Sequence, residues 1–284
     1  MKNRLFPILS ALAAVIIYSC GGEAKDPKTD KTDADTLAAD TTPLKIYTLP
    51  APLQIPNAIK GFKTKYSEEF LIPTNKSDIA YNTNFQKAVN IGIYGIDMGY
   101  AMLFDQTQTS IDYFSRTARL ANDLNILGAF DKQVIEDFRR NIDNRDSAIY
   151  IVLSSFNNAH MFLKKDNRKE IGLLITAGSF VEGLHLSSSI YKKEKSKEVI
   201  DLIAQQKLFL DNIVELLYAY QDQQEIKTLN EKLMDLKTVY DGVVITFKPG
   251  DKPHTNIVDK LEITEDQLAA IGTKVTAIRE YLVN

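Results

Sequence analysis

Cysteine, tryptophan and histidine are scarce in this chain of 284 residues, which contains one cysteine, no tryptophan and three histidines. A single cysteine cannot form a disulfide within the chain, so the fold must depend on its apolar core. Without tryptophan, the sequence offers no sugar-stacking platform of the usual kind. These absences exclude a disulfide scaffold and weaken the case for a carbohydrate-binding protein.

Several motifs of catalytic and nucleotide-binding sites are also absent. The sequence contains no Gly-x-Ser-x-Gly, no Walker loop, no dinucleotide fingerprint and no His-Glu-x-x-His. Each of these motifs supplies a specific element, such as an exposed nucleophile, a phosphate cradle or a pair of zinc ligands. We therefore predict no catalytic residues and no cofactor.

The first 20 residues have the organisation of an export signal. Two cations precede an apolar run over 5–18, and the single cysteine, Cys20, follows. A short apolar run after a basic start is typical of a signal peptide rather than a buried helix. Residues 17–20, Ile-Tyr-Ser-Cys, resemble the lipobox of bacterial lipoproteins, in which the cysteine is acylated. We predict a signal peptide at 1–19 and lipidation of Cys20; an ordinary cleaved signal or a spanning anchor is the alternative.

The next segment, residues 20–45, consists mainly of Thr, Asp, Lys and Ala. It cannot bury enough apolar surface to offset the entropy of ordering, so we predict a disordered tether. Removal of the signal with Lys2 and Arg4 would change the formal charge from -3 to -5. This acidity argues against nucleic acid and against an anionic lipid surface as partners. The predicted contact with the membrane is the N-terminal lipid.

Residues 46–284 are interpreted as one all-α domain, an up-down helical bundle or bundles. Four prolines mark an irregular lead-in before residue 74, which we expect to lie across the domain surface. Apolar residues at intervals of three and four then predict eight helices. The predicted helices span 83–105, 107–125, 131–142, 145–165, 168–191, 196–220, 224–241 and 264–282. The helix at 196–220 has the broadest apolar side, which is typical of a core helix.

Helix boundaries have their own signals. Asp131, Ser196 and Thr264 stand where N-caps belong, and Thr264 with a glutamine three residues later predicts a capping box. Gly128 and Gly242 stand where helices are expected to end.

Two predicted helices repeat each other's apolar spacing. An offset of 85 residues places Asp97 on Glu182 and Tyr100 on His185, and each helix is followed by a second long amphipathic helix. This order predicts two repeated bundle-like units, at 77–165 and 168–284. Because any two amphipathic helices can be aligned in this way, chance spacing is the alternative.

Glu182 and His185 form a Glu-x-x-His pair, which some helical bundles use to bind iron. A dinuclear site requires two such pairs and two further glutamates, and this chain has one pair. A mononuclear site that draws on Glu182, His185, Asp97 and His160 is the remaining metal hypothesis. The simpler interpretation is that Asp97 and Glu182 are buried acids that bond to backbone groups or tyrosine hydroxyls between helices.

Six glycines lie within the same two helices. They are Gly92, Gly95, Gly99, Gly172, Gly178 and Gly183. Each costs about 1 kcal/mol of helix propensity relative to alanine. Close approach of the two backbones would offset that cost, and this is our prediction; glycines that line a ligand cleft are the alternative.

Residues 243–263 interrupt the helical pattern. Val, Ile, Thr and Phe before Pro249-Gly250, and Ile-Val after it, predict a small hairpin or two extended arms. A long irregular connection in a helical domain usually has a functional reason, so we expect the loop from Phe247 to Asn256 to be exposed and to contact a partner. The predicted partner-binding residues are Lys248, Asp251, Lys252 and His254.

Three segments carry a resemblance to a known family: FQKAVNIGIYGIDMGYAMLFDQ, ITAGSFVEGLHL and QQKLFLDNIVELL. They resemble a family of uncharacterised envelope lipoproteins of Bacteroidota, and the similarity spans nearly the whole mature chain. The resemblance implies an all-helical fold and an outer-membrane address, and it brings no established activity. In that group acidic residues after the lipidated cysteine are linked to surface export. The weakly acidic residues 21–25 favour the periplasmic face.

Two functional classes follow from these observations. The first is a non-catalytic helical module for binding or scaffolding, tethered to the outer membrane, with an envelope protein or small ligand as partner. The second is an enzyme or a metal-dependent sensor or oxidoreductase built on Asp97, His160, Glu182 and His185.

Overall fold

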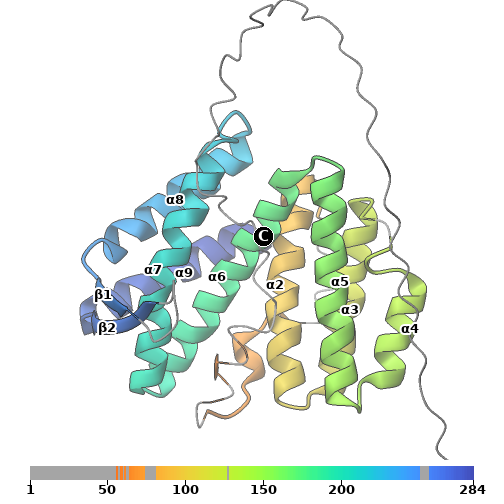
Figure 1. Ribbon diagram of the computed structural model, residues 1–284, viewed down its shortest axis with the longest axis horizontal. Coiled ribbons are helices and arrows are strands. Elements are labelled where there is room, and N and C mark those ends of the chain that lie inside the picture. Colours follow the sequence, from red (N-terminus) through yellow and green to blue (C-terminus); the bar gives the residue numbers. More distant parts are fainter. Residues whose placement is uncertain are drawn as a thin grey trace, which may run out of the picture. The chain divides into compact units, whose positions relative to one another are not determined.

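The computed structural model is mostly helical, as predicted, and its elements follow the predicted order (Figure 1). It describes residues 56, 58–59, 61, 64–73, 81–126, 128–249 and 256–284, all of which belong to the compact unit 46–284. The predicted signal, Cys20 and the tether lie outside the described residues. The elements are η1 (Glu68–Phe70), α2 (Asn84–Leu103), α3 (Thr107–Asp123), α4 (Lys132–Asn141), α5 (Arg145–Lys165), α6 (Lys169–Lys193), α7 (Lys197–Tyr218), α8 (Gln224–Tyr240), β1 (Val244–Pro249), β2 (Asn256–Glu262) and α9 (Glu265–Val283).

The predicted N-caps are confirmed. The side chains of Asp131, Ser196 and Thr264 each accept a hydrogen bond from the backbone N–H three residues later, and Thr264 makes the expected capping box. The end of α3 differs from the prediction. The helix stops at Asp123, and Asn125, with a φ of 54°, takes the left-handed backbone conformation next to the helix end. Gly128 also has a positive φ, of 78°, but it lies further along the connection. Asparagine tolerates this conformation, so it can end a helix as glycine does.

Helices α2 and α6 pack directly against each other, with α3 beside α2, and α7 and α9 beside α6 (Figure 1). The two run in the same direction, because Val89 of α2 meets Gly178 of α6 and, further along both helices, Asp97 meets Glu182. Contact is close enough for the Ser179 hydroxyl to donate a 3.2 Å hydrogen bond to the carbonyl of Gly92. The predicted approach of two helix backbones is therefore confirmed at these positions.

Gly172 departs from that pattern. An added Cβ there would find its nearest neighbour, a methyl group of Leu163, at 4.0 Å, so no backbone approaches it. The prediction that this glycine serves close packing is wrong, because it lies in the first turn of α6, before the helices meet.

The core helix is α6 rather than α7. Helix α6 is apolar on all sides, and in the described part of the chain it alone is long and apolar enough to cross a membrane, although 83% of that stretch is buried in the protein. In α7, by contrast, Leu208 and Phe209 are exposed. The expectation from the broad apolar side of α7 is wrong because helix composition does not specify which sides have neighbours.

The two strands of the predicted hairpin are present. Strands β1 and β2 pair antiparallel, with an irregularity between Thr246 and Phe247. Residues 250–255, including Asp251, Lys252 and His254, lie outside the described residues. Of the predicted partner-binding residues, the structure describes Lys248. Its side chain is exposed, and its Nζ lies 3.3 Å from Oδ1 of Asp259 on the other strand.

The lead-in does not simply cross the surface. Phe70, Leu71 and Ile72 are buried against the helices, and Ile72 is 2% exposed. Of the four prolines, Pro73 stands in irregular backbone as predicted, Pro56 has helical backbone, and the other two lie outside the described residues. A proline carries no information on the depth of the backbone. This buried segment covers the polar cluster described next.

Candidate functional site

Asp97 and Glu182 lie together in the interior between α2 and α6. Both side chains are fully buried, with 0% exposure, and their carboxyl groups are within hydrogen-bonding reach of one another. The parallel packing of the two helices brings the acids to the same level. Two buried carboxyl groups in contact cannot both carry a full negative charge without a compensating group.

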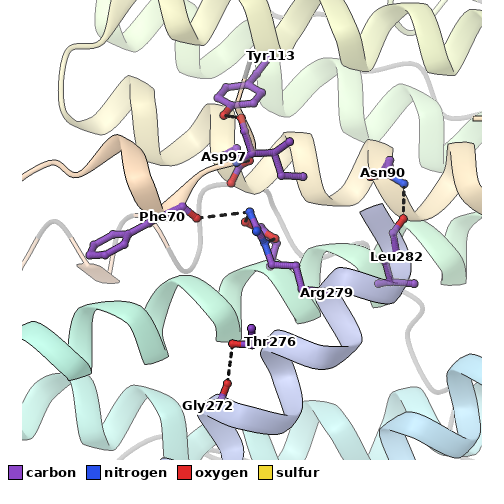
Figure 2. Close-up of polar contacts among 10 residues, drawn as sticks. Phe70, Asn90, Asp97, Tyr113, Gly272, Thr276, Arg279 and Leu282 are labelled. Carbon is purple, nitrogen blue, oxygen red and sulfur yellow. Dashed lines mark hydrogen bonds and ion pairs between the residues drawn. The ribbon is translucent and has the colours of Figure 1, made fainter. Parts of the chain in front are cut away.

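Arg279 of α9 is that compensating group. Its Nε donates to Glu182 Oε2 over 2.6 Å and its Nη2 to Glu182 Oε1 over 2.8 Å, a two-pronged ion pair in which the arginine side chain is 15% exposed. Figure 2 shows Arg279 reaching from α9 toward Asp97, with a further contact to the carbonyl of Phe70 at 3.5 Å. Burial lowers the pKa of Arg279, but the Glu182 carboxylate raises it more, so the guanidinium stays charged.

Asp97 has a different environment. Its Oδ2 accepts a 3.1 Å hydrogen bond from the backbone N–H of Ile72, while its buried Oδ1 meets no hydrogen-bond donor. Burial and the neighbouring Glu182 carboxylate raise the pKa of Asp97 well above its ordinary value of 3.8. A proton on Oδ1, donated to Glu182, would satisfy both oxygens. With that proton in place, the cluster would hold one carboxylate, one neutral acid and one guanidinium.

Two tyrosine hydroxyls form hydrogen bonds with the backbone of the lead-in, which covers this cluster. The hydroxyl of Tyr113, which Figure 2 shows beside Asp97, donates to the carbonyl of Ile72. The Tyr100 hydroxyl accepts from the N–H of Ser67 over 3.1 Å. Burial raises the pKa of Tyr100 to about 12, so its hydroxyl stays neutral. Because both bonds involve backbone groups, they fix the position of the lead-in whatever its side chains.

Tyr113→Phe is expected to lower the free energy of unfolding by about 1 to 3 kcal/mol, because it leaves the buried carbonyl of Ile72 without a donor. Chemical denaturation measures this change, and hydrogen exchange should show faster exchange at the amides of residues 70–72. Tyr150→Phe is the matched control, since Tyr150 is 72% exposed. Equal stability of the two variants would show that the tyrosine does not hold the lead-in.

The four predicted metal-ligand candidates do not form one group. Asp97 and Glu182 meet, and His185 lies close enough to Glu182 for that carboxylate to raise the pKa of its ring. His160 lies on α5 and is partly exposed. Among the described residues no three or more His, Cys, Asp or Glu side chains are placed to hold a metal ion. Burial lowers the pKa of His185 to about 4, so its ring is neutral at pH 7, and its buried Nδ1 has no hydrogen-bond partner.

Two surface hollows lie elsewhere in the described part of the chain. One, of about 590 Å³, lies between the starts of α7 and α9 and the hairpin, and includes Ile200, Leu261 and Gln267. The other, of about 230 Å³, lies between the α2–α3 and α4–α5 connections. Neither is lined by Asp97, Glu182 or His185. The buried cluster therefore has no access to a ligand through these hollows.

Arg279, Tyr113 and the lead-in backbone were not anticipated from the sequence. A signal for Arg279 exists, because it follows Val275 by four residues and precedes Leu282 by three, along the apolar stripe of α9. A cation on such a stripe indicates a buried acid as its partner. For Ile72 no comparable signal exists, since its role depends on backbone atoms.

Comparison with family models, curated proteins and solved structures gives no match. The fold and the cluster define an all-α protein whose central helices enclose an ion pair and a second buried acid. The resemblance to envelope lipoproteins remains a prediction.

Proposed function

We propose that this protein is a lipoprotein tethered to the outer membrane, on its periplasmic face, whose helical domain binds or scaffolds an envelope partner without catalysis. The proposal rests on the observation that the carboxyl groups of Asp97 and Glu182 are already hydrogen-bonded to other parts of the fold. Both oxygens of Glu182 are bonded to Arg279, and Oδ2 of Asp97 is bonded to the backbone of Ile72. Carboxyl groups bonded in this way stabilise the interior of the fold. The surface of the domain is therefore the part that is free to recognise a partner.

The metal-dependent class is retained as the second candidate because of His185. Its unpartnered Nδ1 is buried one helical turn from Glu182, at the spacing of a Glu-x-x-His pair. A metal there would have to compete with Arg279 for Glu182.

A metal inventory of the full chain, purified from its native host, separates the two classes. Elemental analysis should find no stoichiometric metal in the wild type, and an Asp97→Asn variant should capture the same envelope proteins after crosslinking as the wild type. One metal ion per chain that disappears in a His185→Ala variant would replace the scaffolding proposal with the metal-dependent one.

Cys20→Ala is expected to abolish incorporation of labelled fatty acid and to leave the precursor unprocessed, because the thiol is the acceptor of the first lipid. Metabolic labelling and the gel mobility of the chain measure both effects. Ser19→Ala, which keeps a small residue before the cysteine, is the control and should be processed normally. If the Cys20 variant is cut elsewhere and released in soluble form, the lipid anchor is wrong.

A further inference from the structure

The outer face of α5 carries an apolar stripe. Tyr150, Leu153 and Met161 are 72%, 37% and 56% exposed. At 100° per residue these three lie within about 80° of one another around the helix axis. Among the described elements, α5 packs mainly against α4 and α6. The residues that α5 buries, such as Val152 and Ala159, lie on the opposite side of the helix from the stripe.

Other exposed apolar residues do not gather in this way. On α7, Leu208 and Phe209 point about 100° apart, and Tyr218 lies about 80° from Leu208 in the other direction, so the three spread over about 180° of the helix. Single exposed apolar residues are normal on a protein surface, whereas an aligned set indicates a contact. The stripe on α5 is therefore the stronger candidate for a docking surface.

Opposite charges stand at the two ends of the stripe. Asp146 in the first turn of α5 and Lys164 in the last turn are both exposed and lie on the same side as Tyr150 and Met161. Within the described part of the chain, neither charge has an ion pair. Asn157, also exposed, lies between the apolar residues.

We infer that this face docks on the same face of a second copy, with the two α5 helices antiparallel about a two-fold axis near residue 155. In that register Tyr150 meets Met161 of the second copy, and Leu153 meets Asn157 of the second copy. Asp146 meets Lys164 of the second copy, and each contact occurs twice. An isologous dimer requires such a self-complementary surface.

The charges select the antiparallel arrangement. A parallel pair would set Asp146 against Asp146 and Lys164 against Lys164, so that like charges would oppose each other at both ends. Like-charge contacts suppress the wrong pairing, while opposite charges set the register. The charge pattern thus specifies a second copy rather than an unrelated helix.

A pair of single helices makes a small interface. Helix α5 has 21 residues, which corresponds to about 32 Å of contact length at most. Stable interfaces bury about 1,200 to 2,000 Å² in total, so the dimer is expected to be weak and reversible. Self-association must therefore be measured over a concentration series.

Sedimentation equilibrium of the full chain in detergent tests this inference. The wild type should show a monomer–dimer equilibrium, and Tyr150→Lys should weaken the dimer at least about tenfold, since it places a charge in the apolar centre. Tyr218→Lys is the matched control, because Tyr218 is 68% exposed but lies on α7, and it should leave the equilibrium unchanged. A monomeric wild type throughout the series, or equal effects of the two substitutions, would overturn the inference.

Charge reversal tests the register. Asp146→Lys and Lys164→Asp should each weaken self-association, because each sets like charges together twice. When the two variants are mixed, every end contact of the mixed pair joins opposite charges, so a heterodimer should form. Circular dichroism verifies that both variants are folded, as expected for exposed positions. Failure of the mixture to associate more strongly than either variant alone would exclude the antiparallel register.

Discussion

Gly92→Ala and Gly178→Ala are each expected to lower the free energy of unfolding by about 3 kcal/mol or more. A Cβ on Gly92 would overlap the carbonyl oxygen of Ile175 and lie 2.6 Å from the backbone nitrogen of Ser179. A Cβ on Gly178 would overlap the carbonyl oxygen of Val89. Both obstacles are backbone atoms, which cannot rotate away, so the two helices must separate. Overpacking of a core usually costs about 1 to 3 kcal/mol, and backbone obstacles place these sites at or above that range.

Gly172→Ala is the matched control in the same helix. Its Cβ would meet nothing closer than 4.0 Å, so the substitution should stabilise the protein by about 0.5 to 1 kcal/mol through the higher helix propensity of alanine. Urea denaturation measures all three variants. If the alanines at 92 and 178 are tolerated as well as the one at 172, α2 and α6 are not in backbone contact.

Glu182→Gln is expected to destabilise the protein by about 3 to 5 kcal/mol, because it leaves the Arg279 guanidinium buried without a counter-charge. Asp97→Asn should have a much smaller effect. The asparagine amide resembles the neutral acid, since its oxygen accepts from Ile72 and its nitrogen donates to Glu182. Chemical denaturation of both variants at pH 7 measures the difference. A similar loss of stability in the two variants would contradict the assignment of the charge to Glu182 and the proton to Asp97.

The pH dependence of stability provides a second measurement on Asp97. Burial and Glu182 raise its pKa in the folded protein, so above the ordinary value of 3.8 the folded state holds a proton that the unfolded state has lost. Stability from this group is therefore greatest below that value and falls as the pH rises through the raised pKa. Asp97→Asn should remove this fall. A gain in stability relative to wild type that grows with pH above 4 is the expected result.

His185 acts in the opposite direction, and its range overlaps with that of Asp97. Burial lowers its pKa to about 4, so its contribution is present at neutral pH and is lost as the pH falls from about 6.5 to 4. Since both the wild type and Asp97→Asn retain His185, the difference between their pH profiles isolates Asp97. Identical profiles would show that Asp97 is ionised in the folded protein.

The sequence by itself determined the helices and their starts. Periodic apolar residues and the caps at Asp131, Ser196 and Thr264 act within one or two turns of chain, so the information they need is local. The same holds for the hairpin, where a Pro-Gly pair separates two β-rich runs. The glycines of α2 and α6 indicated close packing, because their propensity cost needs a structural reason. Which glycine makes the contact depended on where two distant helices cross.

Only the tertiary structure decided the state of the acid pair. The partner of Glu182 is Arg279, 97 residues away, and the backbone that binds Asp97 belongs to a lead-in whose residues give no periodic signal. The protonation of Asp97 depends on the burial of both acids and on the sharing of one guanidinium between them. Burial, charge pairing and desolvation are properties of groups brought together in space, so no local pattern specifies them. The exposed stripe on α5 illustrates the same limit, because helical spacing alone cannot distinguish an apolar side that packs inward from one that remains on the surface.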